Sequence, residues 1–265
     1  TTDPLIAGLV IGGTSTRTIL LRAIGPGLAP FGVSTGIPHP SMRLYDGNGD
    51  VVSENAGWGG SAALSAVFNQ VGAFALDPNS ADAAMLVTLA PGRYSVVVTD
   101  ATAATGVALA EVYDTGTDTS ASAPRLVNIS SRATANSGDT TLIGGFVISG
   151  PSSKRVLIRG VGPTLANYGV TAPMADPILN LYDGSNNLIA QNDNWETPIT
   201  LTSAQPGASA ADINAAILQA GSFAFSSGSK DAAIIVTLAP GIYSAQVKST
   251  TSTDGTALVE IYELP

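Results

Sequence analysis

The chain has 265 residues, with 11 Lys and Arg, 20 Asp and Glu, one His and no Cys. A net charge of −9 argues against nucleic-acid binding and against attraction to an anionic membrane, because both need clusters of basic residues. The absence of Cys excludes disulfides and thiolate nucleophiles, and a single His excludes a multi-His metal centre. Charged residues make up 12% of the chain, against about 25% in a typical soluble protein, so few charges are available for its surface.

No stretch approaches the roughly 18 apolar residues that a membrane helix requires, so no membrane insertion is expected. Low Lys content and abundant Thr, Ser, Ala, Gly and Asn favour an extracellular or cell-surface bacterial protein. The chain begins at Thr1 without Met, so we expect that any secretion signal has already been removed.

The sequence is a tandem duplication. Residues 8–11 (GLVI) recur as 145–148 (GFVI), an offset of 137. After a 12-residue insertion near 197–209 the offset becomes 149, and residues 87–92 (VTLAPG) recur unchanged as 236–241. A period this long is typical of whole domains rather than of solenoid repeats. We expect domain 1 at residues 1–117, a flexible linker at 118–124 and domain 2 at 125–265.

Each copy has the pattern of an antiparallel β-sandwich. Short runs rich in branched and aromatic residues are separated by Gly, Pro and Asn turns. In the first copy these predicted strands are residues 18–22, 42–45, 85–89, 94–98 and 108–113. One short helix per copy is predicted from apolar residues at helical spacing. These residues are Leu64, Val67, Phe68 and Val71 in the first copy, and Ile213, Ala216, Ile217 and Ala220 in the second.

Two family resemblances follow from longer motifs. Residues 181–184 (LYDG), 188–193 (LIAQND) and 238–243 (LAPGIY) resemble the bacterial pre-peptidase C-terminal domain, which implies a jelly-roll-like sandwich. The motifs at 126–132, 159–163 and 260–262 more closely resemble a tandem repeat of large bacterial surface and extracellular proteins. Both resemblances imply an extracellular, non-catalytic β module.

Two charges interrupt the apolar strands of each copy. They are Arg22 and Glu111 in the first, and Arg159 and Glu260 in the second. A charge inside a core strand needs a partner, because burying it alone costs several kcal/mol. We therefore predict one structural Arg–Glu pair per domain. Neither copy shows a second carboxylate or a nucleophile in an evident cleft motif, so the sequence predicts no enzyme.

Ligand binding is the alternative interpretation. Asp183, Asn192 and Asp193 supply oxygen atoms on turns, a chemistry that suits Ca²⁺, and some domains of the pre-peptidase family bind calcium. The usual role of Asx residues at such turns is to bond their own backbone. Trp58 and Trp195 each follow a loop Asn by three residues, and an exposed indole could stack on a sugar ring. The more common role of such a Trp is to close the end of a sandwich. No other cofactor is expected.

The copies also differ at their starts. The second has a strand-like segment, residues 125–133, before its first repeated strand, whereas only residues 1–4 precede Leu5 in the first copy. The expectation is that the edge containing Leu5, Leu9 and Ile11 is vacant and pairs with a strand from another copy of the protein. The donor could be a strand like that of Leu126 and Ile129, or a terminal segment such as residues 259–265.

The favoured function is thus a non-enzymatic structural subunit of an extracellular bacterial assembly, a fibre or filament, surface layer or adhesive stalk, with copies of itself as partners. The alternative is an accessory carbohydrate- or calcium-binding module of a secreted hydrolase or adhesin.

Overall fold

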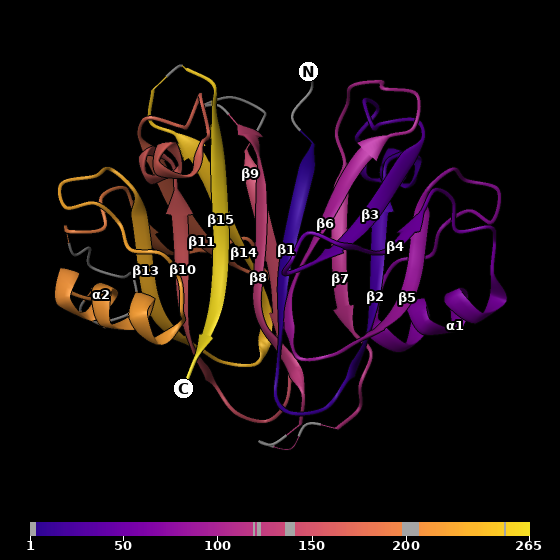
Figure 1. The fold of residues 1–265 in the computed structure, drawn as a ribbon, viewed down its shortest axis with the longest axis horizontal. Coiled ribbons are helices and arrows are strands. Elements are labelled where there is room, and N and C mark those ends of the chain that lie inside the picture. Colours follow the sequence, from indigo (N-terminus) through magenta and orange to yellow (C-terminus); the bar gives the residue numbers. More distant parts are fainter. Residues whose placement is uncertain (1–3, 119, 121–122, 136–140, 198–206, 252) are drawn as a thin grey trace. The chain divides into compact units, whose positions relative to one another are not determined.

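The computed structural model describes residues 4–118, 120, 123–135, 141–197, 207–251 and 253–265 (Figure 1). It divides the chain into two compact units, Thr1–Val127 (unit 1) and Asn128–Pro265 (unit 2). The boundary lies inside a strand, downstream of the linker expected at 118–124. Residues 119, 121 and 122 of that linker lie outside the described residues. In the described residues, no helix is long and apolar enough to cross a membrane.

Unit 1 is built from two antiparallel sheets, whose strand orders are β1-β6-β3-β4 and β5-β2-β7. Its described elements are β1 (Leu5–Gly12), β2 (Arg17–Ile24), the 3₁₀ helix η1 (Pro26–Phe31), β3 (Pro40–Asp46), β4 (Val51–Asn55), α1 (Ala62–Val71), β5 (Ala83–Leu89), β6 (Gly92–Asp100) and β7 (Leu109–Asp114).

Unit 2 repeats this arrangement with one additional strand, giving the orders β13-β10-β15-β8 and β12-β11-β14-β9 among its described residues. Its elements are β8 (Arg125–Ala135), β9 (Leu142–Ile148), β10 (Lys154–Val161), η2 (Pro163–Tyr168), β11 (Pro177–Asp183), β12 (Leu188–Asn192), α2 (Ala210–Gln219), β13 (Ala232–Leu238), β14 (Gly241–Ser249) and β15 (Gly255–Leu264). β8 begins three residues before the unit boundary, at Arg125.

Strands β2 and β10 are buried on both faces, which explains why they read as continuous apolar runs rather than alternating ones. Ile19 and Leu21 point into the interior between the two sheets of unit 1. Leu20 and Ile24 point to the opposite face, where Phe68 of α1 packs on them. Because side chains alternate along a strand, Arg22 shares this helix-covered face with Leu20 and Ile24. Arg159 takes the corresponding place in unit 2.

The helices begin and end where their capping residues predict. Ser61 caps α1 by accepting a hydrogen bond from the backbone N–H of Leu64, and Gly72 ends the helix at φ 73°. Ser209 and Asp212 form a reciprocal capping box at the start of α2. The prediction of an all-β, antiparallel fold with one short α-helix in each copy is confirmed. The two 3₁₀ helices were not predicted, since Gly25-Pro26-Gly27 reads as a simple turn.

Strand β8 does not lie where the sequence suggested. It pairs antiparallel with β15, the last strand of unit 2. The counterpart of β1 is β9, which pairs with β14 in the other sheet. The expectation that residues 125–133 form a hairpin with the first repeated strand of their own copy, β9, is therefore wrong, because adjacency along the chain does not fix adjacency in a sheet.

Candidate functional site

The structure brings the predicted pair of unit 1 together. Arg22 on β2 lies directly opposite Glu111 on β7. Its Nε lies 2.9 Å from Oε2 of Glu111, and its side chain is fully buried. The Tyr113 hydroxyl donates to Oε1 of Glu111 at 2.7 Å, and Nη1 of Arg22 donates to the carbonyl oxygen of Phe74 at 2.8 Å. Both charges are thus engaged within the unit.

Unit 2 holds an equivalent pair. Nη1 of Arg159 lies 3.0 Å from Oε2 of Glu260, and the Tyr262 hydroxyl donates to Oε1 of Glu260 at 2.7 Å. Nη1 of Arg159 also donates to the hydroxyl of Ser222. At the offset of 149, Ser222 corresponds to Ala73 of unit 1, which has no hydroxyl. Unit 1 therefore uses a backbone carbonyl where unit 2 uses a side chain.

Each guanidinium lies over two phenylalanine rings. The Cζ of Arg22 is 4.6 Å from the ring centre of Phe68 and 4.4 Å from that of Phe74. The Cζ of Arg159 is 4.3 Å from the ring centre of Phe223 and 4.2 Å from that of Phe225. Phe74 and Phe223 are equivalent at the offset of 149. The Nη2 atoms of both arginines lack a hydrogen-bond acceptor, so cation–π attraction compensates part of their lost hydration.

The second ring comes from a different place in each unit. Phe68 is on α1, and its equivalent in α2 is Ile217. Phe225 is in the loop after α2, and its equivalent in unit 1 is Leu76. At each of these two positions, one copy has a phenylalanine and the other has an aliphatic residue. The arginine therefore keeps a second aromatic ring against it in both units.

Burial dominates the titration of this cluster. Desolvation raises the pKa of Glu111, and the Arg22 charge and the Tyr113 hydrogen bond act against it. Desolvation also lowers the pKa of Arg22, against the attraction of Glu111. The pKa values of Tyr113 and Tyr262 are raised, first by burial and next by the adjacent glutamate. A raised glutamate pKa occurs in general acids, but here the carboxylate contacts only its own ion-pair and hydrogen-bond partners, which supports a structural role.

A second buried carboxylate in each unit escaped the sequence analysis. Asp82 accepts hydrogen bonds from the backbone N–H groups of Gly25 and Gly27 through Oδ1, at 2.8 and 3.2 Å. Asp231 accepts from Gly162 and Thr164 in the same way. These bonds fix the entry to η1 and η2. The sequence feature that could have indicated these aspartates is an Asp-Ala-Ala tripeptide, which both copies carry at the start of β5 and β13.

The two aspartates differ at Oδ2. In unit 2 this atom accepts from the Ser229 hydroxyl at 2.7 Å and from the Thr164 hydroxyl. Gly27 replaces Thr164 in unit 1, and Oδ2 of Asp82 has no hydrogen-bond partner there. A Cβ at Gly27 would lie 2.9 Å from that oxygen, so the site is closely packed.

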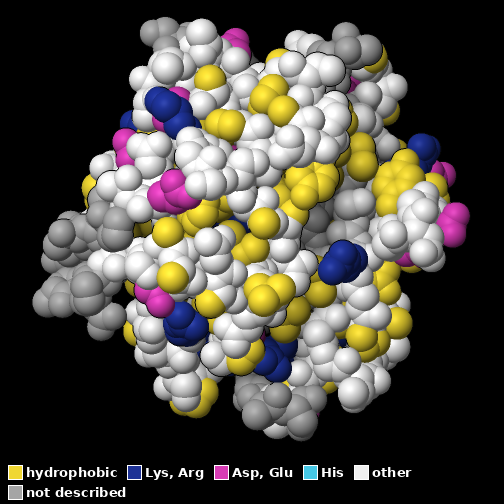
Figure 2. Space-filling model, turned by 60° about the vertical axis from the view of Figure 1, so that its left-hand side comes forward, with side chains coloured by type: hydrophobic (Ala, Val, Ile, Leu, Met, Phe, Trp, Pro, Cys, Tyr) yellow, Lys and Arg dark blue, Asp and Glu magenta, His cyan; other side chains and the backbone are white. Residues whose placement is uncertain are grey.

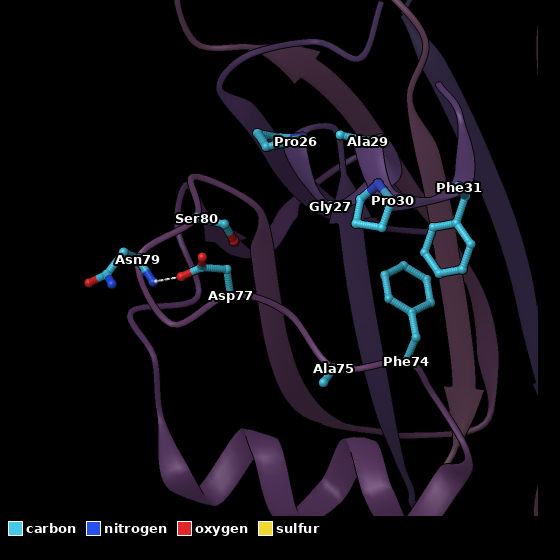
Figure 3. A pocket seen from close by; sticks show the side chains of 10 residues that line it. All are labelled: Pro26, Gly27, Ala29, Pro30, Phe31, Phe74, Ala75, Asp77, Asn79 and Ser80. Carbon is cyan, nitrogen blue, oxygen red and sulfur yellow. Dashed lines mark hydrogen bonds between the residues drawn. The ribbon is translucent and has the colours of Figure 1, made fainter. Parts of the chain in front are cut away.

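Unit 1 has a surface pocket of about 510 Å³ between η1 and the loop that follows α1 (Figure 3). Its apolar wall includes Phe31 and Phe74, whose ring centres are 4.9 Å apart in an edge-to-face arrangement. Asp77 is the one ionisable side chain among its lining residues, and its Oδ1 accepts from the Asn79 backbone N–H at 2.8 Å. The lining therefore contains no pair of groups suited to general acid–base catalysis.

The residues considered for calcium serve local structure. Oδ1 of Asp183 accepts from the backbone N–H groups of Ser185 and Asn187, as in an Asx turn. Asn192 is buried, its Oδ1 accepts from the Ala233 N–H and its Nδ2 donates to two carbonyls. Asp193 is exposed. In the described part of the chain, no three Asp, Glu, His or Cys side chains cluster as metal ligands would. Calcium binding stays a prediction.

The tryptophans are not platforms for sugars. Trp58 and Trp195 are both buried. Each packs on a phenylalanine of the arginine cluster, with ring centres 5.6 Å apart. The Trp58 indole N–H donates to the carbonyl oxygen of Asp77, and that of Trp195 donates to the Ser229 hydroxyl. These rings close the core beneath the helices, which agrees with the structural interpretation of the two tryptophans and leaves no exposed indole for sugar stacking.

The residues expected at a vacant assembly edge point inward. Leu9 and Ile11 belong to the core of unit 1, and Leu5 and Leu126 pack against it. Ile129 packs against the core of unit 2. Positions Gly12 and Gly13 lie against Val127 and Pro124 of the same unit, so the chain itself covers this end of β1. The expected vacancy at this end of β1 is therefore wrong.

Comparison with known proteins assigns no family. No protein-family description matches the sequence, and no curated protein matches it. Among solved structures, the major capsid protein P2 of bacteriophage PM2 aligns over 100% of this chain and 93% of its own, at 10% identity and a TM-score of 0.22. The STIV MCP aligns over the same shares at 12% identity and a TM-score of 0.22. TM-scores this low do not establish a common fold.

Proposed function

We propose that the protein is a non-enzymatic structural subunit of an extracellular bacterial assembly, such as a fibre, surface layer or adhesive stalk, whose partners are copies of itself. The observation that carries this proposal is an apolar patch on the outer face of unit 2. Ile143 and Val147 of β9 are 53% and 66% exposed, and Ile242 of β14, directly opposite Val147, is 66% exposed. Branched side chains this exposed and this close together favour a protein contact.

The position of the patch strengthens the argument. Among the described strands, β9 pairs only with β14, so one edge of β9 is open within its sheet. An open edge with branched apolar side chains on its outer face is a site at which another chain can associate. Unit 1 does not repeat the patch, since the equivalents of Ile143 and Val147 are the half-buried Ile6 and Val10, and Arg93 replaces Ile242.

The face drawn in Figure 2 carries few charges, which fits a protein that makes uncharged contacts. Figure 2 shows charged side chains scattered among hydrophobic and uncharged ones. The carboxylates of Glu111 and Glu260 are engaged by their own arginines and tyrosines. An extracellular bacterial location remains a proposal supported by composition and by the resemblance of the repeat.

The test is assembly of the full chain as a function of concentration. Wild-type protein should form polymers visible by negative-stain microscopy and by sedimentation velocity. The double variant Val147→Ser/Ile242→Ser should need at least about tenfold more protein to assemble, which corresponds to 1.4 kcal/mol of lost contact energy. Leu218→Ser is the matched control, because Leu218 on α2 is 82% exposed outside the patch. Wild-type protein that stays monomeric, or a double variant that assembles equally well, would contradict the proposal.

The pocket of Figure 3 favours a second candidate, an accessory carbohydrate-binding module. The Phe31 ring beside it is 62% exposed, and Asp77, Asn79 and Ser80 add polar groups to its rim. Aromatic and polar groups together suit a sugar face. Glycan-array binding that is lost in Phe31→Ala, with unchanged assembly, would favour this candidate over the first.

A further inference from the structure

The last strand of each repeat has a different environment in the two units. In unit 2, β15 lies between β10 and β8 and pairs with both. Its equivalent in unit 1, β7, pairs with β2, and no described strand pairs with its other edge. Within the described residues, unit 1 therefore lacks one strand of the fold that unit 2 completes.

The free edge of β7 has the composition of a paired strand. At the offset of 149, residues 109–114 (LAEVYD) correspond to 258–263 (LVEIYE). Val259, Glu260 and Ile261 are buried in unit 2, whereas Ala110, Glu111 and Val112 are only partly buried. Native edge strands are commonly protected by Pro, by exposed Lys or by a bulge. β7 contains neither Pro nor Lys, and its register with β2 is continuous.

Unit 2 also shows which sequence fits this edge. Ile129 of β8 lies opposite Ile261, and Ser130 and Ser131 lie opposite Glu260 and Val259. Ile129 packs against the interior between the sheets. Small side chains opposite the glutamate leave its pair with Arg159 undisturbed.

An asparagine completes the fit at the end of the strand. Asn128 lies opposite Tyr262, and its Nδ2 donates to the carbonyl oxygen of Ile261 at 3.0 Å. The equivalent acceptor in unit 1 is the carbonyl oxygen of Val112.

We propose that the free edge of β7 binds, antiparallel, a β8-type strand supplied by another copy of this repeat. The strand would place a branched residue opposite Val112, small polar residues opposite Glu111 and Ala110, and an asparagine opposite Tyr113. Backbone hydrogen bonds supply the attraction, and this alternation of side chains sets the register. The proposal is independent of the apolar patch on β9 and β14.

The probe is a synthetic peptide with the sequence of residues 125–135, added to the full chain. Amide hydrogen exchange in residues 109–114 should slow by at least about tenfold at saturation, because their free N–H groups become bonded. Residues 258–263 are the internal control, since β8 already occupies their edge. A scrambled peptide of the same composition should change neither segment.

Register can be tested by disulfide trapping, because the protein has no cysteine. Leu109 corresponds to Leu258, which lies opposite Arg132. Protein carrying Leu109→Cys should therefore cross-link to a peptide carrying Arg132→Cys, since directly opposite residues have Cα atoms about 4.5–5.5 Å apart, within disulfide range. A peptide carrying Ser131→Cys presents its thiol on the other face and should cross-link at least about tenfold less.

Three outcomes would overturn the proposal. They are unchanged exchange in residues 109–114, equal cross-linking by the two cysteine peptides, and a peptide effect confined to residues 258–263. The Val147→Ser/Ile242→Ser variant should still bind the peptide. Failure of assembly and failure of strand binding are therefore distinguishable.

Discussion

Arg159 on β10 faces Glu260 on β15 as its direct cross-strand partner, with 3.0 Å between Nη1 and Oε2. Arg22 and Glu111 hold the same relationship in unit 1. The pair thus joins the central strand of one sheet to the last strand of the repeat, on the face that the helix covers.

Removing one partner should leave the other charge buried and uncompensated. We expect Glu260→Ala to lower the free energy of unfolding by roughly 3 to 5 kcal/mol, measured by urea or thermal denaturation. Glu54→Ala is the matched control, because the Arg43–Glu54 pair is more than half exposed on both sides, and it should change the free energy of unfolding far less. An unchanged melting temperature for Glu260→Ala would show that the pair is dispensable.

The second phenylalanine ring over the arginine comes from different positions in the two units. We therefore predict that a second substitution can restore the stability lost when the first ring is removed. Phe68→Ile should destabilise unit 1 by about 1 to 3 kcal/mol, since Arg22 loses one of its rings and the core loses volume. Adding Leu76→Phe reproduces the arrangement of unit 2 and should restore most of that loss. The measurement is a double-mutant cycle by thermal unfolding. Strictly additive effects of the two substitutions would mean that the second ring does not act on the same site.

The hydroxyl of Thr164 should matter because it donates to the buried Oδ2 of Asp231. Thr164→Val keeps the shape and removes the donor, so unfolding should become easier by about 1 to 3 kcal/mol. Thr164→Ser keeps the donor and should retain more stability than the valine variant. If serine and valine destabilise equally, the packing of the methyl group and not the hydrogen bond is what Thr164 supplies.

Asp100 should contribute a pH-dependent part of the stability of unit 1. Burial opposes ionisation, but hydrogen bonds from the Thr102 hydroxyl and from the backbone N–H groups of His39, Thr102 and Ala104 lower the pKa of Asp100 to about 2. Because its folded pKa lies below 3.8, the value of an unperturbed aspartate, this stability is present above pH 3.8 and is lost as pH falls toward 2. Asp100→Asn should therefore melt lower than wild type at pH 6, and the difference should shrink below pH 4. A difference that is constant over this range would contradict the assignment.

The sequence was sufficient to predict the strands, from the alternation and clustering of apolar residues, and the ion pairs, from isolated charges within those strands. Arg22 and Glu111 could be paired because each is a lone charge in an apolar strand and each has an equivalent in the second copy. The pairing of β8 with β15 could not be predicted, because strand order depends on long-range packing that the spacing of residues does not contain. Trp58 looked like a loop residue, and its burial depends on Phe68 and on a carbonyl acceptor nineteen positions later, at Asp77. Asp82 was passed over because a single carboxylate before a strand resembles a turn residue.

Each unit contains one tryptophan, buried against a phenylalanine of the arginine cluster. The emission of Trp58 therefore reports on unit 1 and that of Trp195 on unit 2. Trp58→Phe and Trp195→Phe each leave a single fluorophore, so the melting of either repeat can be followed spectroscopically without any added label. Equal midpoints for the two probes would mean that the duplicated halves unfold as one cooperative system, and separate midpoints would give each half its own stability.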